Sequence, residues 1–111
     1  MSDLATKRCV PCTEATPRIP PEEVKRLIST LPGYVADVLI GSISKIYDFA
    51  DFYETMAFVN AVAFIANRED HHPDLTVSYK RCLVTYTTHA IGGLSENDFI
   101  CAAKIEALLE R

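Results

Sequence analysis

Residues 52–66 read FYETMAFVNAVAFIA, a segment in which apolar side chains recur every three or four positions. Such spacing is typical of an α-helix. Two apolar stripes are present, formed by Phe52, Met56, Val59, Ala63 and Ala66 and by Phe58, Val62 and Ile65. Glu54 is the only charged residue in the segment. A helix that is apolar on two faces must be covered on two sides, and one side can be a sheet.

The second apolar face favours contact with another copy of the chain. A protein of 111 residues buries a limited share of its surface when it folds, so self-association adds useful burial. The alternative is that a loop or a terminal helix of the same chain covers this face. We expect a homo-oligomer.

Strand-like segments flank this helix on both sides. Residues 34–39 and 43–49 precede it, joined at Gly41-Ser42, and residues 75–79 and 81–88 follow it. A first helix is expected between Pro21 and Pro32, and a last helix from the capping box at residues 95–98 to about residue 110. The order α-β-β-α-β-β-α predicts an α+β fold, a four-stranded antiparallel sheet with three helices packed on one face.

Length and charge limit the classes of protein to which the chain can belong. The 111 residues, 49% hydrophobic, fit one domain, with residues 1–19 as an N-terminal tail and residues 20–111 as the folded part. The net charge of −4 comes without a basic stripe, which argues against direct nucleic-acid binding. No signal peptide and no apolar run of ~20 residues is present, so we expect a soluble, cytoplasmic protein and no membrane contact.

The four cysteines fall into two groups. Cys82 lies in a strand pattern and Cys101 in a helix pattern, and both are expected to be small buried apolar residues. Cys9 and Cys12 have the spacing of a metal or redox motif, but no second such pair supplies the four ligands of a structural zinc site. A metal or disulfide role and an exposed tail with two reduced thiols both remain open.

All three histidines lie in short polar clusters between predicted elements. His71 and His72 belong to Glu69-Asp70-His71-His72-Pro73-Asp74, and His89 ends Thr87-Thr88-His89. Imidazole titrates near pH ~6.5, so these clusters indicate proton transfer, with solvated loop histidines as the alternative. A metal site is the weaker interpretation, because no His-x-x-x-His or HExxH spacing occurs. Pro73 favours an extended His72, whose side chain should then point away from that of His71.

Three further residues are open to two interpretations each. Asp98 is the natural partner of the last helix's capping box, and it could also orient a histidine. Tyr79 is expected to be half buried in the sheet, with pocket lining as the alternative. Asp70 could accept a hydrogen bond from a histidine or a ligand, or lie on the surface.

Taken together, these segments resemble the pterin-4a-carbinolamine dehydratase family over residues 46–109. The centre of the resemblance is DHHPD at 70–74, Tyr79, TTH at 87–89 and GLSEND at 93–98. The helix entry FADF at 49–52 and MAFVN at 56–60 are also similar to the family's sequences. Several separated motifs in the same order make this a specific signal, and it identifies residues 20–111 as a domain of this kind.

The resemblance implies an activity and a site. Family members dehydrate 4a-hydroxytetrahydropterin to quinonoid dihydropterin in tetrahydrobiopterin recycling, without a metal or cofactor, and form homodimers or homotetramers. By this similarity His71 and His89 perform acid–base catalysis, and His72 holds the pterin and shares in the proton transfer. The implied substrate-binding residues are Asp70, His71, His72, Pro73, Tyr79, Thr87, Thr88, His89, Ala90 and Asp98.

The chain departs from the family pattern at three positions. Asn67 stands four residues before the first histidine, where the family usually has an acid, and an amide cannot exchange a proton as a carboxylate can. Ala90 replaces an acid that often follows the third histidine, and Gly33-Tyr34 replaces Gly-Trp. Some relatives act as assembly factors or transcriptional cofactors, so a non-catalytic module on the same fold is the alternative function.

Overall fold

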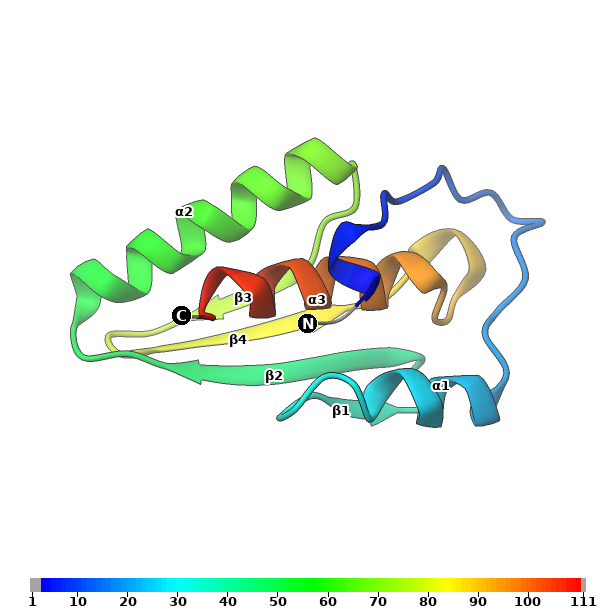
Figure 1. The fold of residues 1–111 in the computed structure, drawn as a ribbon, viewed down its shortest axis with the longest axis horizontal. Helices are drawn as coiled ribbons and strands as arrows, with labels where there is room; N and C mark the ends of the chain where they lie inside the picture. The colour runs from blue at the N-terminus through cyan, green and yellow to red at the C-terminus, as the bar shows by residue number, and fades with distance from the viewer. Residues whose placement is uncertain (1–2, 111) are drawn as a thin grey trace.

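Helices and strands follow one another in the predicted order. The computed structural model describes residues 3–110, in which helices α1 (Pro21–Ile28), α2 (Phe52–Glu69) and α3 (Glu96–Leu108) alternate with strand pairs. The strands are β1 (Val35–Asp37), β2 (Ser42–Asp48), β3 (Asp74–Val77) and β4 (Arg81–Tyr86), all antiparallel in the order β1-β2-β4-β3. Two 3-10 helices, η1 (Asp3–Thr6) and η2 (His89–Ile91), complete the chain (Figure 1). The predicted α+β fold class is confirmed.

The core lies between the sheet and α3, which crosses one sheet face in Figure 1. Alternate residues of β4 point into it, and Cys82, Val84 and Tyr86 are fully buried, as the period of two predicts. Cys101 on α3 is also fully buried, so the expected burial of Cys82 and Cys101 is confirmed. On the other sheet face Ile46 of β2 is half exposed.

The β1–β2 hairpin is shorter than the sequence predicts. The apolar run Val38-Leu39-Ile40 is typical of a strand, yet β1 ends at Asp37 and Leu39 is 96% exposed. The Asp37 carboxylate accepts the backbone N–H groups of Leu39 and Ile40, each at 3.1 Å, and turns the chain. Gly41 closes the turn with φ of +78°, and a Cβ there would lie 2.7 Å from Cα of Gly93.

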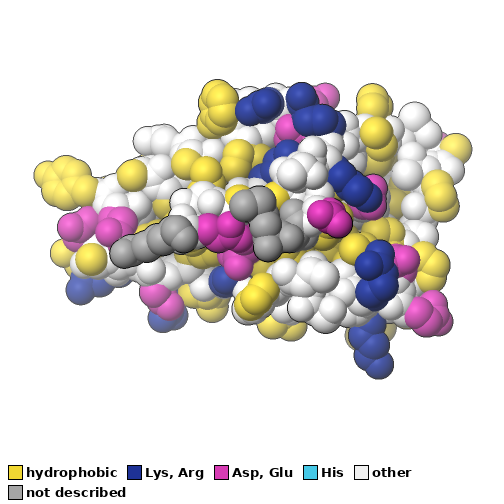
Figure 2. All heavy atoms as spheres, in the orientation of Figure 1, with side chains coloured by type: hydrophobic (Ala, Val, Ile, Leu, Met, Phe, Trp, Pro, Cys, Tyr) yellow, Lys and Arg dark blue, Asp and Glu magenta, His cyan; other side chains and the backbone are white. Residues whose placement is uncertain are grey.

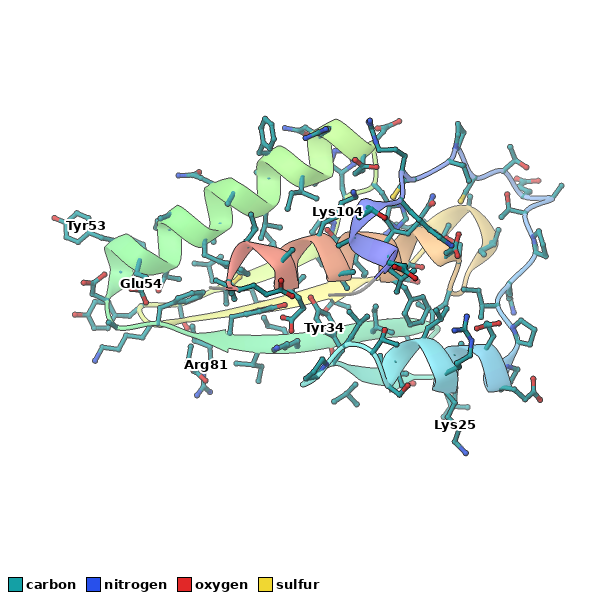
Figure 3. All side chains as sticks on the ribbon, in the orientation of Figure 1. Lys25, Tyr34, Tyr53, Glu54, Arg81 and Lys104 are labelled. Atoms are coloured by element: carbon teal, nitrogen blue, oxygen red, sulfur yellow. The ribbon has the colours of Figure 1, made fainter. Side chains whose placement is uncertain are left out.

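Helix α2 begins as expected and ends later than expected. The Asp51 side chain accepts the backbone N–H of Glu54 at 2.8 Å and so caps the start of the helix. The helix continues three residues past Ala66 to Glu69. The stripe of Phe58, Val62 and Ile65 is buried against the core, whereas Phe52 and Ala63 of the other stripe are exposed. Tyr53 points away from the body of the protein at the first turn (Figure 3).

The N-terminal segment lies against the domain, although the sequence suggests a free tail. Helix η1 packs on α3, with Leu4 buried in the core. Lys104 reaches from α3 toward η1 (Figure 3), where its Nζ donates to the carbonyl of Ala5 at 2.8 Å. From η1 the chain passes round the end of the molecule that carries η2 before it reaches α1 (Figure 1). The N-terminal segment is therefore placed where it can contribute to a site at that end.

The face of the protein in Figure 2 shows charges of both signs. On the face in Figure 2, Lys and Arg side chains are interspersed with Asp and Glu. Within residues 3–110, no helix is both long enough and apolar enough to cross a membrane.

We predict that Ala63→Glu abolishes or weakens self-association. The side chain of Ala63 is exposed on the open stripe of α2, so a carboxylate there disfavours burial against another copy without disturbing the core. Light scattering should report a lower mass than for the wild type. Ala15→Glu, the same change at an exposed position outside α2, is the matched control. An unaltered mass would show that this stripe is not an interface.

Candidate active site

A cavity of about 460 Å³ opens where α2 ends, β4 leads into η2 and the N-terminal segment passes by. Its volume is within the range of roughly 300–1,000 Å³ that small-molecule sites occupy. Four groups of residues line it: Cys9, Val10, Pro11 and Cys12; Glu69, Asp70, His71 and His72; Thr87, Thr88, His89 and Ala90; and Asn97. The structure thus brings together all three histidines, which the sequence places in two clusters.

The turn after α2 sets the direction of two of these histidines. Asp70 caps the helix in the left-handed conformation, with φ of 53° and ψ of 43°, and it is the only such non-glycine residue among residues 3–110. Asp tolerates this conformation better than most residues do. After the turn, the His71 side chain is only 11% exposed, whereas His72 is exposed.

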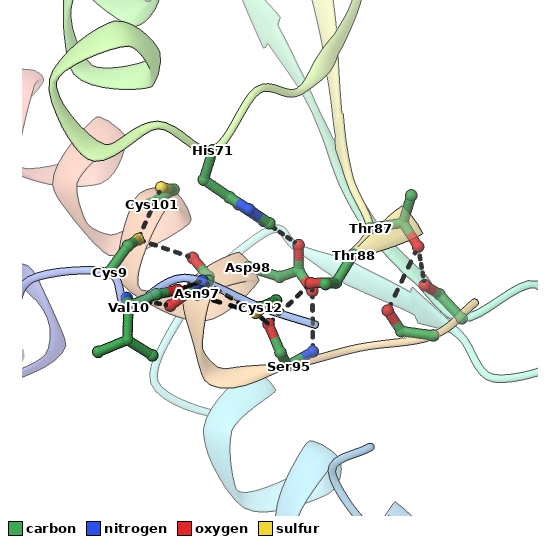
Figure 4. Close-up of polar contacts among 12 residues, drawn as sticks. Cys9, Val10, Cys12, His71, Thr87, Thr88, Ser95, Asn97, Asp98 and Cys101 are labelled. Atoms are coloured by element: carbon green, nitrogen blue, oxygen red, sulfur yellow. Dashed lines mark hydrogen bonds and ion pairs between the residues drawn. The ribbon is translucent and has the colours of Figure 1, made fainter. Parts of the chain in front are cut away.

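His71 is held by a buried carboxylate. Its Nε2 lies 2.6 Å from Oδ1 of Asp98, whose side chain is 0% exposed (Figure 4). Oδ2 of Asp98 accepts the Thr88 hydroxyl at 2.8 Å and the backbone N–H of Ser95 at 3.0 Å. The same carboxylate therefore completes the capping box of α3 and contacts the histidine, one oxygen for each. Asp98 does not line the cavity and acts through His71.

The environment of His71 favours its protonated form. Burial by itself would lower the pKa of the imidazole, but the hydrogen bond and the charge of Asp98 outweigh burial and raise the pKa above its ordinary value. The ring also lies parallel to that of Tyr86, with centroids 5.7 Å apart and an angle of 4° between the planes. The stacked ring and the Asp98 contact fix the orientation of the imidazole.

The opposite wall is built by the end of β4 and by η2. The Thr87 hydroxyl donates to the carbonyl of Gly41 at 2.6 Å, which ties this wall to the β1–β2 hairpin. Thr88 is buried and pairs with Gly93 in an isolated bridge. His89 and Ala90 follow on η2 and are exposed. The wall thus presents His89 on a short turn that is anchored at both ends.

His72 has a neutral partner. Its Nε2 lies 3.2 Å from Oδ1 of Asn67, one turn earlier on α2. An amide oxygen only accepts, so Nε2 of His72 is the donor in this contact. At this position the chain therefore has no carboxylate that could exchange a proton.

Besides Asp98, two residues of the implied binding set lie outside the cavity lining. Pro73 follows His72 at the start of the connection to β3. Tyr79 lies in the β3–β4 turn, where its carbonyl accepts the hydroxyl of Thr55 near the start of α2 at 3.2 Å. The cavity is at the other end of this 18-residue helix, which is about 27 Å long. Tyr79 is 66% exposed, not half buried, and does not contact the cavity of its own chain.

Sequence reasoning missed the residues that the N-terminal segment brings to the cavity. Glu69 is almost fully buried, with its carboxylate bound to Arg8 and to the backbone N–H of Cys9 at 2.8 Å. Burial would raise the pKa of Glu69, but these contacts outweigh it and lower the pKa. The spacing of Cys9 and Cys12 is the only sequence signal for this segment, and it suggests metal or redox chemistry, not a cavity wall.

All four cysteines are free in the structure. Sγ of Cys9 lies 3.5 Å from Sγ of Cys101, and Cys12 faces Asn97 and Ser95. The part of the chain that the structure describes contains no group of three or more His, Cys, Asp and Glu side chains that could hold a metal ion.

A sequence model of pterin 4 alpha carbinolamine dehydratases matches residues 17–108. The class of enzyme is therefore a dehydratase, a hydro-lyase. More particularly, this chain belongs to the pterin 4 alpha carbinolamine dehydratase family, and the predicted membership is confirmed.

Curated relatives are similar over nearly their full length. A protein of Nitrosospira multiformis is 57% identical over 110 residues, which cover 99% of this chain and 96% of the relative. A protein of Nitrosomonas europaea is 50% identical over 110 residues, covering 97% of this chain and 95% of the relative. Both carry the provisional name pterin-4-alpha-carbinolamine dehydratase.

Two solved structures share the fold. A transcriptional coactivator/pterin dehydratase from Brucella melitensis matches with a TM-score of 0.81 and 29% identity, over 85% of this chain and all of that one. A pterin dehydratase-like protein, described as a RuBisCO assembly factor in the alpha-carboxysome, matches with a TM-score of 0.56 and 21% identity. It covers 68% of this chain and 84% of its own, and it shows the fold alone.

We predict that Asp98→Asn lowers the pKa of His71, because burial is then no longer outweighed by a charge. Titration of the ring protons of His71 by NMR measures this pKa.

The raised pKa of His71 also stabilises the fold. This stabilisation is fully present below pH ~6.5 and decreases as pH rises through the folded-state pKa. The free energy of unfolding of the wild type should therefore fall over this window, and that of Asp98→Asn should fall less.

Asp48→Asn is the matched control, because Asp48 pairs with Arg81 on the surface, away from the cavity. It should leave the titration of His71 as in the wild type. An unshifted His71 pKa in Asp98→Asn would contradict this account of the pair.

Proposed function

We propose that the protein catalyses dehydration of 4a-hydroxytetrahydropterin to quinonoid dihydropterin, with histidines as the acid and base. The observation that carries the proposal is a buried His71–Asp98 pair at a cavity that His89 also lines. Family membership and the names of the close relatives support the reaction. The expected setting is tetrahydrobiopterin recycling in the cytoplasm.

The reaction needs two proton movements. The C4a–O bond breaks and the hydroxyl leaves as water once it has received a proton; N5 loses a proton, and a C4a=N5 double bond forms. Proton count and oxidation level balance without an electron acceptor, so the step calls for no redox cofactor. A pair of imidazoles near neutral pH can supply one proton and accept the other.

His71 is suited to be the acid. Its raised pKa favours the protonated form, and Asp98 stabilises the imidazolium. Because Nε2 is engaged by Asp98, the proton available to substrate is the one on Nδ1. His89 lies on the exposed turn of the facing wall and is suited to accept the proton of N5. Holding both groups across one cavity lets a single bound substrate meet them together.

The remaining lining residues would hold the pterin. His72 and Asp70 offer polar groups at the end of α2, and Thr87 and Ala90 offer a hydroxyl and backbone groups on the facing wall. The Thr88 hydroxyl is already hydrogen-bonded to Asp98 and Ser95. Thr88 would therefore shape the cavity wall and orient Asp98. We also propose that the protein works as a homodimer or homotetramer, since Phe52 and Ala63 on α2 and Ile46 on one sheet face are exposed in the single chain.

The alternative function is a non-catalytic assembly or cofactor module on this fold. One observation favours it: the partner of His72 is the amide of Asn67, where a carboxylate is usual in the family. The solved relatives include one protein described as a coactivator and dehydratase and another described as an assembly factor. An assembly module with a decayed site should not bind 7,8-dihydrobiopterin, which separates the two functions.

We predict that His71→Ala and His89→Ala each reduce turnover by ~100-fold or more, the range expected for general acid–base groups. Stopped-flow decay of enzymatically generated 4a-hydroxytetrahydropterin, with and without protein, measures the rate. Circular dichroism should show both variants folded. Lys25→Ala, an exposed change on α1, is the control with wild-type rates. Undiminished rates in both histidine variants would refute the assignment.

We predict that Asn67→Glu raises kcat up to about tenfold, because a carboxylate beside Nε2 of His72 can take part in proton transfer. Asn67→Gln keeps an amide and is the matched control. An equal kcat in both variants would show that this position does not limit the reaction.

A further inference from the structure

The segment Cys9–Cys12, called the strap below, lines the cavity without a role in the proton transfers proposed above. It lies across the cavity from η2 and precedes the region that the family model matches. Val10 is 63% exposed, so packing of its side chain in the core does not hold the strap in place. Polar contacts to the strap backbone do so.

Asn97 on the first turn of α3 makes the main contact. Its Oδ1 accepts the backbone N–H of Val10 at 3.1 Å, and its Nδ2 donates to the carbonyl of Val10 at 2.7 Å (Figure 4). Nδ2 also lies 3.3 Å from Sγ of Cys12. Asn97 is itself buried and satisfies both backbone groups of one residue, as a neighbouring β-strand would.

Glu69 holds the other end of the strap. Its buried carboxylate accepts the backbone N–H of Cys9, and Arg8 neutralises its charge. Glu69 is the last residue of α2, two positions before His71, and Asn97 directly precedes Asp98. The two side chains that hold the strap thus come from the same helix ends that carry the His71–Asp98 pair.

This arrangement suits a binding wall better than core packing. A buried polar side chain lowers stability unless its hydrogen bonds are made, and here Asn97 and Glu69 make theirs to the backbone of the strap beside the cavity. The result is a wall of fixed position, whose Cys12 thiol lines the space that a ligand would fill.

We propose that the strap is one wall of the pterin site and that Asn97 and Glu69 are positioning residues that set the affinity for the pterin through it. The proposal rests on the dehydratase function proposed above. It also gives the Cys9-x-x-Cys12 motif a role that needs neither a metal nor a disulfide: Cys9 packs against Cys101 of α3, and Cys12 faces the ligand.

The test uses Asn97→Leu, which keeps the size of the side chain and removes its contacts with Val10. Two such hydrogen bonds correspond to roughly tenfold or more in an equilibrium constant. The dissociation constant of 7,8-dihydrobiopterin and the KM of the dehydratase should each rise about tenfold or more. The kcat should stay within about threefold, because the His71–Asp98 pair is untouched.

Glu96→Gln is the matched control. Glu96 neighbours Asn97 on α3 and binds Lys7 of the N-terminal segment at 2.9 Å, but it does not line the cavity. It should leave both constants as in the wild type. Equal pterin affinity in wild type and Asn97→Leu, or an equal loss in Glu96→Gln, would overturn the proposal.

Cys12→Phe provides a second test that leaves the hydrogen bonds of Asn97 to Val10 in place, and it decides the matter if Asn97→Leu does not fold. A large side chain projecting from the strap should weaken pterin binding about tenfold or more. In the wild type, saturating 7,8-dihydrobiopterin should also slow alkylation of Cys12 by iodoacetamide. Unchanged binding by Cys12→Phe, with no protection of Cys12, would overturn the proposal.

The two proposals fail in different ways. A folded wild-type protein that neither binds 7,8-dihydrobiopterin nor accelerates the dehydration refutes the dehydratase function, and the strap proposal with it. A wild type that does both, together with strap variants that bind equally well, refutes the strap proposal alone.

Discussion

The buried carboxylate of Asp98 connects three of the segments around the cavity. It binds His71 after α2, Thr88 at the end of β4 and the backbone of Ser95 before α3. A fully buried carboxylate is unfavourable unless each oxygen is satisfied, so these segments must meet in one arrangement. The contacts that satisfy this one buried carboxylate therefore fix how the end of α2, the end of β4 and the start of α3 lie relative to one another.

Local patterns in the sequence predicted what depends on local structure. The spacing of three and four over residues 52–66 predicted α2, alternation predicted the buried face of β4, and Ser95 to Asp98 predicted the start of α3. The β1 prediction was too long because Val38 to Ile40 are apolar. The Asp37 carboxylate, which turns the chain, acts over only two or three residues.

Contacts between residues that are far apart in the sequence could not be predicted from local patterns. Val10 and Asn97 are 87 positions apart, and no periodicity relates them. Tyr79 is the opposite case. It is close to the histidine cluster in the sequence, but in the structure it lies at the start of α2, and the length of that helix separates it from the cavity. The family resemblance implied that the three histidines share one site, and all three line one cavity in the structure. Family motifs reflect a three-dimensional arrangement, which the spacing of residues along one chain does not.

Three histidines at one cavity are not equivalent, and the difference lies in their surroundings. His71 combines burial, a parallel aromatic ring and a buried carboxylate, whereas His72 faces an amide and His89 lies exposed on a short turn. Side chains of one type can act as acid and base in the same step when their environments favour different protonation states. Burial alone would favour a neutral His71, so the proposed assignment of acid depends on Asp98. The carboxylate that connects the segments around the cavity is thus the same group that raises the pKa of His71.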